Sequence, residues 1–171
     1  MIPKEIAEFL EGATVGFGAT RNAELVPQIH PVQAWRVSDD RKAITCLFSR
    51  GYSEVLLPSL EENGKFSFTV LASTSGPRAS HPPNPTVDLH ECYQLKGDFV
   101  GSRPANEGDL PLVNQKAQQF KAFFQPIFGF SERACDARYG TPALAMTFEV
   151  HEIYDQTPGP EAGTRITMDE G

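Results

Sequence analysis

Residues 65–73, KFSFTVLAS, alternate between apolar and polar side chains, and this alternation is the strongest single constraint on the fold. Phe66, Phe68 and Val70 fall at every second position, which places all three on one face of an extended strand. Residues 42–49, KAITCLFS, are instead apolar at successive positions, as in a strand that is covered on both faces. The chain therefore has to build a sheet with a large buried side.

Further strands are predicted before and after these two. They cover residues 13–19, 25–37, 90–103 and 143–154. Turn-forming residues at 21–24 and 38–41 separate the first three strands, so strands that are neighbours in sequence are expected to pair antiparallel. Gly97 interrupts the strand 90–103 and is expected to mark a bulge or a close approach between strands.

A short N-terminal helix is predicted with Pro3 in its first turn and Gly12 at its end, and further helices are predicted at 53–63 with Gly64 at its end and from Asn106 or Asp109 onward. Two stretches have no periodicity: 74–88 is predicted to be an extended loop that covers a site or reaches a neighbouring chain, and 125–141 is predicted to be irregular. About six sequential strands with few edges favour a barrel over an open sheet. The predicted fold is α+β, a mainly antiparallel six-stranded β-barrel with flanking helices.

The overall composition narrows the class of protein. The chain has 171 residues, a net charge of -7 and a pI near 5.1, which argues against a surface that binds nucleic acid or anionic membrane. No stretch approaches the ~20 apolar residues that a membrane span needs, and the N-terminus is too charged for a secretory signal. We expect a soluble cytoplasmic protein with one domain at 1–160 and a polar C-terminal tail at 161–171. The widely spaced Cys46, Cys92 and Cys135 are expected to be small buried hydrophobes.

The stretch LFSRGYSE, residues 47–54, leads from a strand into a helix start. A helix N-terminus presents unpaired N–H groups and a partial positive charge, which suit an anion. Ser49 and Ser53 can donate hydrogen bonds, and Arg50 can bind phosphate oxygens in bidentate fashion. Two interpretations stay open: a phosphate site, or a strand end and a turn with Ser53 as helix N-cap and no ligand.

Other motifs favour simple structural roles. Gly16-Phe17-Gly18 resembles half of a dinucleotide fingerprint, but a hairpin rather than a helix is predicted to follow, so close backbone packing explains these glycines better. His90 and Cys92, with His81, lack the fixed spacing of a metal site, and we predict none. No G-x-S-x-G or H-E-x-x-H motif occurs, so hydrolase chemistry lacks support.

Three segments resemble the flavin-binding split-barrel proteins, and most closely the pyridoxamine 5'-phosphate oxidase-like family. The first is 42–70, a strand ending in LFS, then Arg50-Gly51 and a helix ending in EENGK before a Phe-rich strand. The second is YQLKGDFV at 93–100 with RPANEGDL at 103–110, and the third is YDQTPGP at 154–160. The resemblance covers roughly residues 5–160 and identifies the predicted barrel as a split barrel.

This resemblance implies a homodimer with FMN in the clefts between subunits. The flavin ring would lie against the second and third strands, and the phosphate would lie where the third strand ends and the next helix starts. The corresponding cofactor-binding residues are Gln33, Ala34, Trp35, Arg36, Leu47, Phe48, Ser49, Arg50, Tyr52 and Ser53. Gln94 lies near a glutamine that contacts the flavin in the oxidase. Trp35 has three possible positions, namely on the flavin, in a dimer interface or in the core.

The chain also departs from the oxidase. The oxidase carries Ser-Arg-Lys at the helix start, whereas this chain has Tyr52-Ser53-Glu54, and the Arg and His that hold pyridoxamine phosphate have no match in 155–171. We therefore do not expect true pyridoxamine phosphate oxidase activity. The leading hypothesis is a flavin-dependent oxidoreductase that acts on an unidentified small molecule, with catalytic residues unassigned. The alternative is a non-catalytic split-barrel binding protein that holds haem, another flavin, a deazaflavin or no cofactor.

Overall fold

The computed structural model describes residues 1–12, 15–71, 91–129 and 131–170. The helices are α1 (Lys4–Gly12), α2 (Arg50–Asn63), the short 3-10 helix η2 (Glu107–Asp109), α3 (Leu110–Phe128) and α4 (Glu132–Arg138). The strands are β1 (Val15–Arg21), β2 (Pro27–Val32), β3 (Ala34–Val37), β4 (Ala43–Ser49), β5 (Lys65–Leu71), β6 (Cys92–Pro104), β7 (Pro142–Asp155) and β8 (Arg165–Ile166). The predicted α+β class is confirmed.

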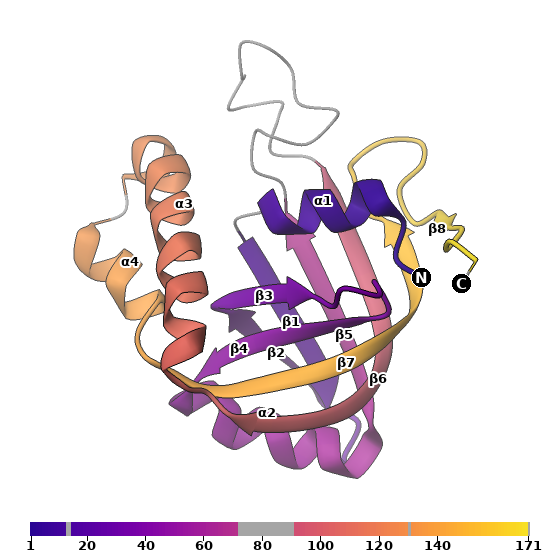
Figure 1. The fold of residues 1–171 in the computed structure, drawn as a ribbon, viewed down its shortest axis with the longest axis horizontal. Coiled ribbons are helices and arrows are strands. Elements are labelled where there is room, and N and C mark those ends of the chain that lie inside the picture. The colour runs from indigo at the N-terminus through magenta and orange to yellow at the C-terminus, as the bar shows by residue number, and fades with distance from the viewer. Residues whose placement is uncertain (13–14, 72–90, 130, 171) are drawn as a thin grey trace.

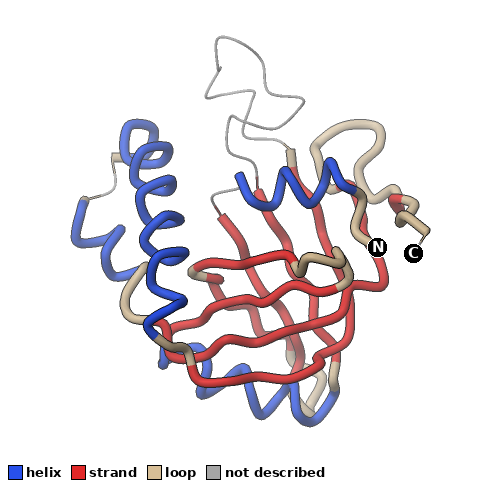
Figure 2. The backbone as a smooth tube through the Cα atoms, viewed as in Figure 1, coloured by secondary structure: helices blue, strands red, loops and turns tan. Residues whose placement is uncertain are grey.

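The strands form one antiparallel sheet that curls on itself (Figures 1 and 2). The strand order is β2-β1-β5-β6-β7-β4-β3, and β8 pairs with β7. Gln33 alone joins β2 to β3, the strands at the two ends of this order. The two ends of the sheet are therefore brought together, and the result is a split barrel with flanking helices.

The inside of the barrel is packed with aromatic rings. Phe66 and Phe68 point inward, as their alternation predicted, and both lie edge-on to Phe148. Gly16 and Gly18 leave room for these rings, because a Cβ on Gly16 would lie 2.7 Å from the ring of Phe68. The expectation that these glycines serve close packing in a barrel agrees with this geometry.

Helix α2 is positioned by one apolar face. Leu56 and Leu60 lie four residues apart and are fully buried in the core. The helix ends at Gly64, which has a φ of 67° and donates its backbone N–H to the carbonyl of Leu60. In Figure 1, α2 crosses one end of the barrel and α1 crosses the other, while α3 and α4 cover one side.

Several predicted boundaries were wrong. The strand 25–37 is broken into β2 and β3 and β8 is added, so the sheet has eight strands where six were predicted. The stretch 125–141 is mostly helical, because α3 continues to Phe128 and α4 follows. Helix α2 begins at Arg50 rather than at Ser53. The predicted loop 74–88 lies outside the described residues.

The cysteines and the C-terminal segment can also be compared with what the sequence predicted. All three cysteines are buried free thiols, as predicted. The segment 161–171 contains β8, whose Ile166 packs against the core. In the part of the chain described, no helix combines the length and the apolar character needed to cross a membrane.

Candidate functional site at the end of β4

Strand β4 runs into helix α2 without a loop, since Ser49 ends the strand and Arg50 begins the helix. The first N–H groups of any helix have no acceptor inside the helix. Ser49 occupies the N-cap position with an extended backbone, but its side chain makes no capping hydrogen bond. The first turn of α2 therefore keeps donors for an external acceptor, in a place where the helix dipole favours an anion.

The side chains of this first turn differ in what they can offer. Arg50 is exposed, and no carboxylate of the described residues lies within 4.0 Å of its guanidinium. Ser53 donates its hydroxyl to the carbonyl of Arg50 at 2.9 Å, so it does not cap the helix as the ligand-free interpretation required. Of Ser49, Arg50 and Ser53, the Arg50 guanidinium and the Ser49 hydroxyl are therefore the side-chain groups that can bind a ligand.

A tyrosine–histidine pair lies beside the helix start. The ring of Tyr52 is 5.5 Å from that of His30 on β2, and the Tyr52 side chain is 38% exposed. Burial lowers the pKa of His30, which favours the neutral imidazole. Its Nε2 is buried and finds no hydrogen-bond partner among the described residues. Sequence reasoning missed His30, because no spacing signal linked it to the strand end.

Gln33 is 1% exposed and holds in place the connection between α4 and β7. Its backbone N–H donates to the carbonyl of Leu47, and its side-chain Nε2 donates to the carbonyls of Arg138 and Gly140 at 3.3 and 2.7 Å. That connection leads into β7, whose first residue is opposite Ser49 in the sheet. Gln33 thus positions the wall of the site rather than lining it.

Arg138 is a second residue that sequence reasoning missed, because it lies in a helix that was predicted to be irregular. Its guanidinium lies 5.2 to 5.7 Å from the ring centroids of Phe17, Phe120 and Tyr139. Within the described part of the chain, the Nε and Nη2 atoms of Arg138 and the Oε1 of Gln33 are buried and have no hydrogen-bond partner. These polar atoms are closed off from solvent.

The strand positions assigned to the flavin ring are covered. Trp35 and Phe48 point into the barrel core and are 2% and 0% exposed. Ala34 and Leu47 face the other side, where Val113 of α3 packs on them. The indole N–H of Trp35 donates to the carbonyl of Leu10 at 2.7 Å, so this residue occupies the core, the third of its possible positions. In this chain only the backbone of these residues could face a ligand.

Arg36 remains accessible on the outer side of β3. Its charge acts on Asp109, which is paired with Arg103 of β6. Arg103 binds both carboxylate oxygens of Asp109, at 2.7 and 2.8 Å, and chiefly for this reason the pKa of Asp109 is lowered, with Arg36 adding a smaller effect. Arg36 is therefore a second cation on the same side of the sheet as the covered Ala34 and Leu47.

Gln94 is not brought to the strand end within one chain. It lies opposite Tyr154 on β7, whereas Ser49 lies opposite Pro142 at the other end of the same strand. The separation along β7 is roughly 40 Å at ~3.3 Å per residue. Gln94 donates to the hydroxyl of Ser67 at 3.1 Å and accepts from Gln156 at 3.3 Å. Of the metal ligands considered, His81 and His90 lie outside the described residues.

Comparison with known proteins supports the fold. No family model matches the sequence, and no curated protein matches it. HupZ of Group A Streptococcus is 18% identical with a TM-score of 0.53, and the match covers 95% of this chain and 100% of that one. An FMN-binding protein from Syntrophomonas wolfei subsp. wolfei is 10% identical over 88% of this chain and 82% of that one, with a TM-score of 0.50. An F420 reductase is 10% identical over 89% of this chain and 98% of that one, with a TM-score of 0.51. The chain therefore has the split-barrel fold that flavin-binding proteins also adopt.

Proposed function

We propose that this protein binds FMN, with the phosphate at the N-terminus of α2, and acts as a flavin-dependent oxidoreductase on a small molecule. The observation that carries the proposal is the first turn of α2, which among the described residues has neither a side-chain cap nor a carboxylate beside the Arg50 cation. It lies at the strand end where the resemblance to the oxidase-like family expects the phosphate. The fold match to an FMN-binding protein supports the same choice of cofactor.

The residues present fit a phosphate group. The first N–H groups of α2, the hydroxyl of Ser49 and the guanidinium of Arg50 all belong to the start of the helix, and each is a donor. A hydrogen bond to a charged group contributes about 1.5–3 kcal/mol. Because Arg50 is exposed, we expect its contribution to lie at the lower end of that range.

Glu54 weakens this site without removing it. It lies four residues after Arg50, about 6 Å further along the helix axis, and its side chain is exposed. A carboxylate and a phosphate dianion ~10 Å apart in water repel each other by roughly 0.8 kcal/mol, and salt reduces that energy further. The repulsion of a phosphate by Glu54 is therefore smaller than the attraction by Arg50.

Bound FMN would supply the electron or hydride transfer, and the protein would bind and orient it. Because Trp35 and Phe48 are turned inward, contact of β3 and β4 with the ring would be made by the backbone. Arg36, exposed on β3, is the charged side chain that could reach the ring from the outer side. The residues that bind substrate are unassigned.

We also propose that the protein is a homodimer with its cofactor sites at the subunit interface. Tyr52 and Val55, one turn apart on α2 beside Arg50, are 38% and 45% exposed. A second subunit placed there would cover both apolar side chains and would close the open side of the site. A mass in solution of about twice 18.8 kDa supports this, and a monomer at all concentrations contradicts it.

A deazaflavin is the second candidate for the cofactor. It is favoured by the similarity in fold to an F420 reductase, at a TM-score of 0.51. The two proposals separate cleanly in a binding experiment, because a protein that binds F420 and not FMN supports the second candidate alone. Failure to bind either cofactor would leave a split-barrel protein that holds haem, another flavin or no cofactor.

Replacing Arg50 with alanine should weaken FMN binding roughly tenfold, because one charge-assisted contact to the phosphate is lost. The measurement is a titration of FMN fluorescence with wild-type and R50A protein. Arg133→Ala is the matched control, since Arg133 is exposed on α4 and should leave the dissociation constant unchanged. Equal affinities for wild type and R50A would exclude Arg50 from the site.

A further inference from the structure

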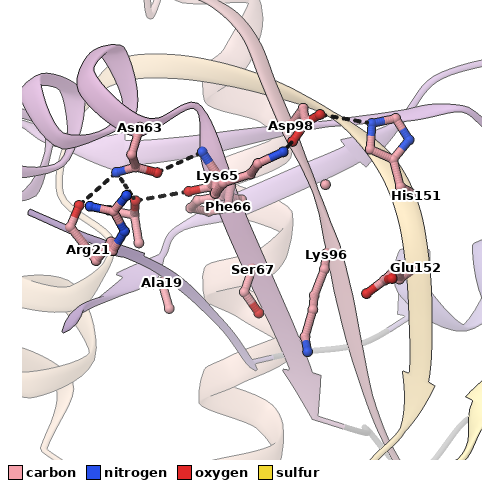
Figure 3. Close-up of a pocket in the computed structure, with 12 residues that line it drawn as sticks. Ala19, Arg21, Asn63, Lys65, Phe66, Ser67, Lys96, Asp98, His151 and Glu152 are labelled. Carbon is pink, nitrogen blue, oxygen red and sulfur yellow. Dashed lines mark hydrogen bonds and ion pairs between the residues drawn. The ribbon is translucent and has the colours of Figure 1, made fainter. Parts of the chain in front are cut away.

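A cavity lies on the outer face of the sheet, and Asn63 at the C-terminal end of α2 is among the residues that line it (Figure 3). Its volume is about 540 Å³, within the usual range of small-molecule sites. Four lining residues are direct cross-strand partners on β1, β5, β6 and β7, so their side chains share one face. They are Ala19, Ser67, Lys96 and Glu152.

These four residues form a row across the sheet, and the shape of the cavity follows from the sizes of their side chains. Ala19 and Ser67 have short side chains and leave a depression, while Lys96 and Glu152 rise at its side. A bulge in β7 adds a further wall, because Lys96 pairs with Glu152 and Gly97 pairs with Val150. His151 is the extra residue of this bulge. Bulges commonly redirect a side chain in this way at binding sites.

Most charges around the cavity have partners. Lys65 donates to Asp98 at 2.5 Å, and His151 lies 3.4 Å from the other oxygen of the same carboxylate (Figure 3). Glu152 accepts from the hydroxyl of Tyr154 at 3.0 Å and lies 3.7 Å from Arg165. These groups form the polar rim of the cavity.

Lys96 is the exception. Its side chain is half-buried, and its Nζ lies 4.5 Å from the ring centroid of Tyr154. Among residues 1–12, 15–71, 91–129 and 131–170, no carboxylate lies within 4.0 Å of it. Ser67, the direct partner of Lys96 on β5, accepts a hydrogen bond from Gln94, which leaves the Ser67 hydroxyl proton free to donate. The wall of the cavity thus presents an ammonium and a hydroxyl without an anionic acceptor.

We propose that this cavity binds a small carboxylate with an apolar body, held by Lys96 and Ser67. The carboxylate would accept from both groups, and the apolar body would lie over Ala19, which also lines the cavity. A phosphate dianion fits less well, because the carboxylates of Asp98 and Glu152 lie on the same rim and would repel the second charge.

The test is a titration of ¹⁵N-labelled protein with benzoate, followed by amide chemical shifts. We expect the shifts to concentrate at Ala19, Ser67 and Glu152, and the dissociation constant to rise roughly tenfold in Lys96→Met. Lys96→Arg should retain binding, and Lys42→Met, which removes an exposed lysine elsewhere, should bind as the wild type does. Benzyl alcohol, which has the same ring without the charge, should not shift the amide signals of these residues.

Several results would overturn the proposal. Shifts that appear elsewhere, or that are unchanged in Lys96→Met, would exclude Lys96 as the anion-binding group. Equal shifts with benzyl alcohol would show that the charge is not recognised, and this comparison needs only wild-type protein. Inorganic phosphate that shifts the same row more strongly than benzoate would exclude a preference for carboxylates.

Discussion

Gly97→Ala should destabilise the protein by at least about 3 kcal/mol, or should prevent folding. A Cβ at this position would lie 2.7 Å from the carbonyl carbon of Glu149 and closer still to its oxygen, and 3.1 Å from the Cα of Val150. All of these atoms belong to the backbone of β7, so no side chain can turn away to make room. The measurement is urea unfolding followed by circular dichroism.

Gly101→Ala is the matched control for this substitution. Gly101 lies on the same strand and next to a second register shift, but a Cβ there would meet no atom within 4 Å. We expect its unfolding midpoint to stay close to that of the wild type. If Gly97→Ala unfolds at the same urea concentration as Gly101→Ala, then the close contact of β6 with β7 is not as described.

The second large effect concerns Lys116, a buried lysine on α3. It is 1% exposed, and its Nζ donates to the carbonyls of Glu11 and Leu10 at the end of α1 and lies 4.4 Å from the Trp35 ring centroid. Burial lowers the pKa of Lys116 from 10.5 to about 8, with a smaller opposing effect from the charge of Glu11. The free energy of unfolding should therefore depend on pH through this group.

The direction follows from proton counting. Between pH 8 and 10.5 the unfolded chain holds the Lys116 proton while the folded protein releases it. The unfolded state then binds more protons, so the contribution of Lys116 to stability rises with pH across this window and is constant below it. The difference between 10.5 and about 8 corresponds to roughly 3 kcal/mol, at about 1.4 kcal/mol per pH unit.

The measurement is the free energy of unfolding of the wild type minus that of Lys116→Met, obtained by urea unfolding from pH 7 to 10. Burial raises the pKa of Cys46 and Cys92, the latter to about 11, so these thiols lower stability above pH 9 in both proteins and cancel in the difference. Lys42→Met, which removes an exposed lysine, should leave the pH profile unchanged. A difference that is flat between pH 8 and 10 would contradict a lowered pKa.

The fold was readable from the sequence where periodicity was strong. The alternation of Phe66 and Phe68 and the end of α2 at Gly64 were correctly predicted, because each depends on local geometry. The prediction that Gly97 marks a bulge or a close approach is confirmed, and the structure shows both. The break at Gln33 was missed, because a single residue between two strands is too short to change the hydrophobic periodicity of the segment.

The candidate site was readable only in part. LFSRGYSE identified the strand end and the helix start, since a chain that changes from strand to helix changes its hydrophobic period there. Contacts between distant segments gave no signal, so His30 was missed, and Arg138 was missed also because its segment was predicted to be irregular. For the same reason the sequence could not show that Lys96 and Ser67 share the outer face with Gln94.

The most direct test of the proposed site is the ratio of the dissociation constants of riboflavin and FMN for the wild-type protein, from fluorescence titrations under one set of conditions. The two ligands share the ring and differ by the phosphate, which the α2 N-terminus and Arg50 are proposed to hold. We expect FMN to bind at least about tenfold more tightly than riboflavin. Equal affinities, or binding of neither ligand, would contradict a phosphate site at the end of β4.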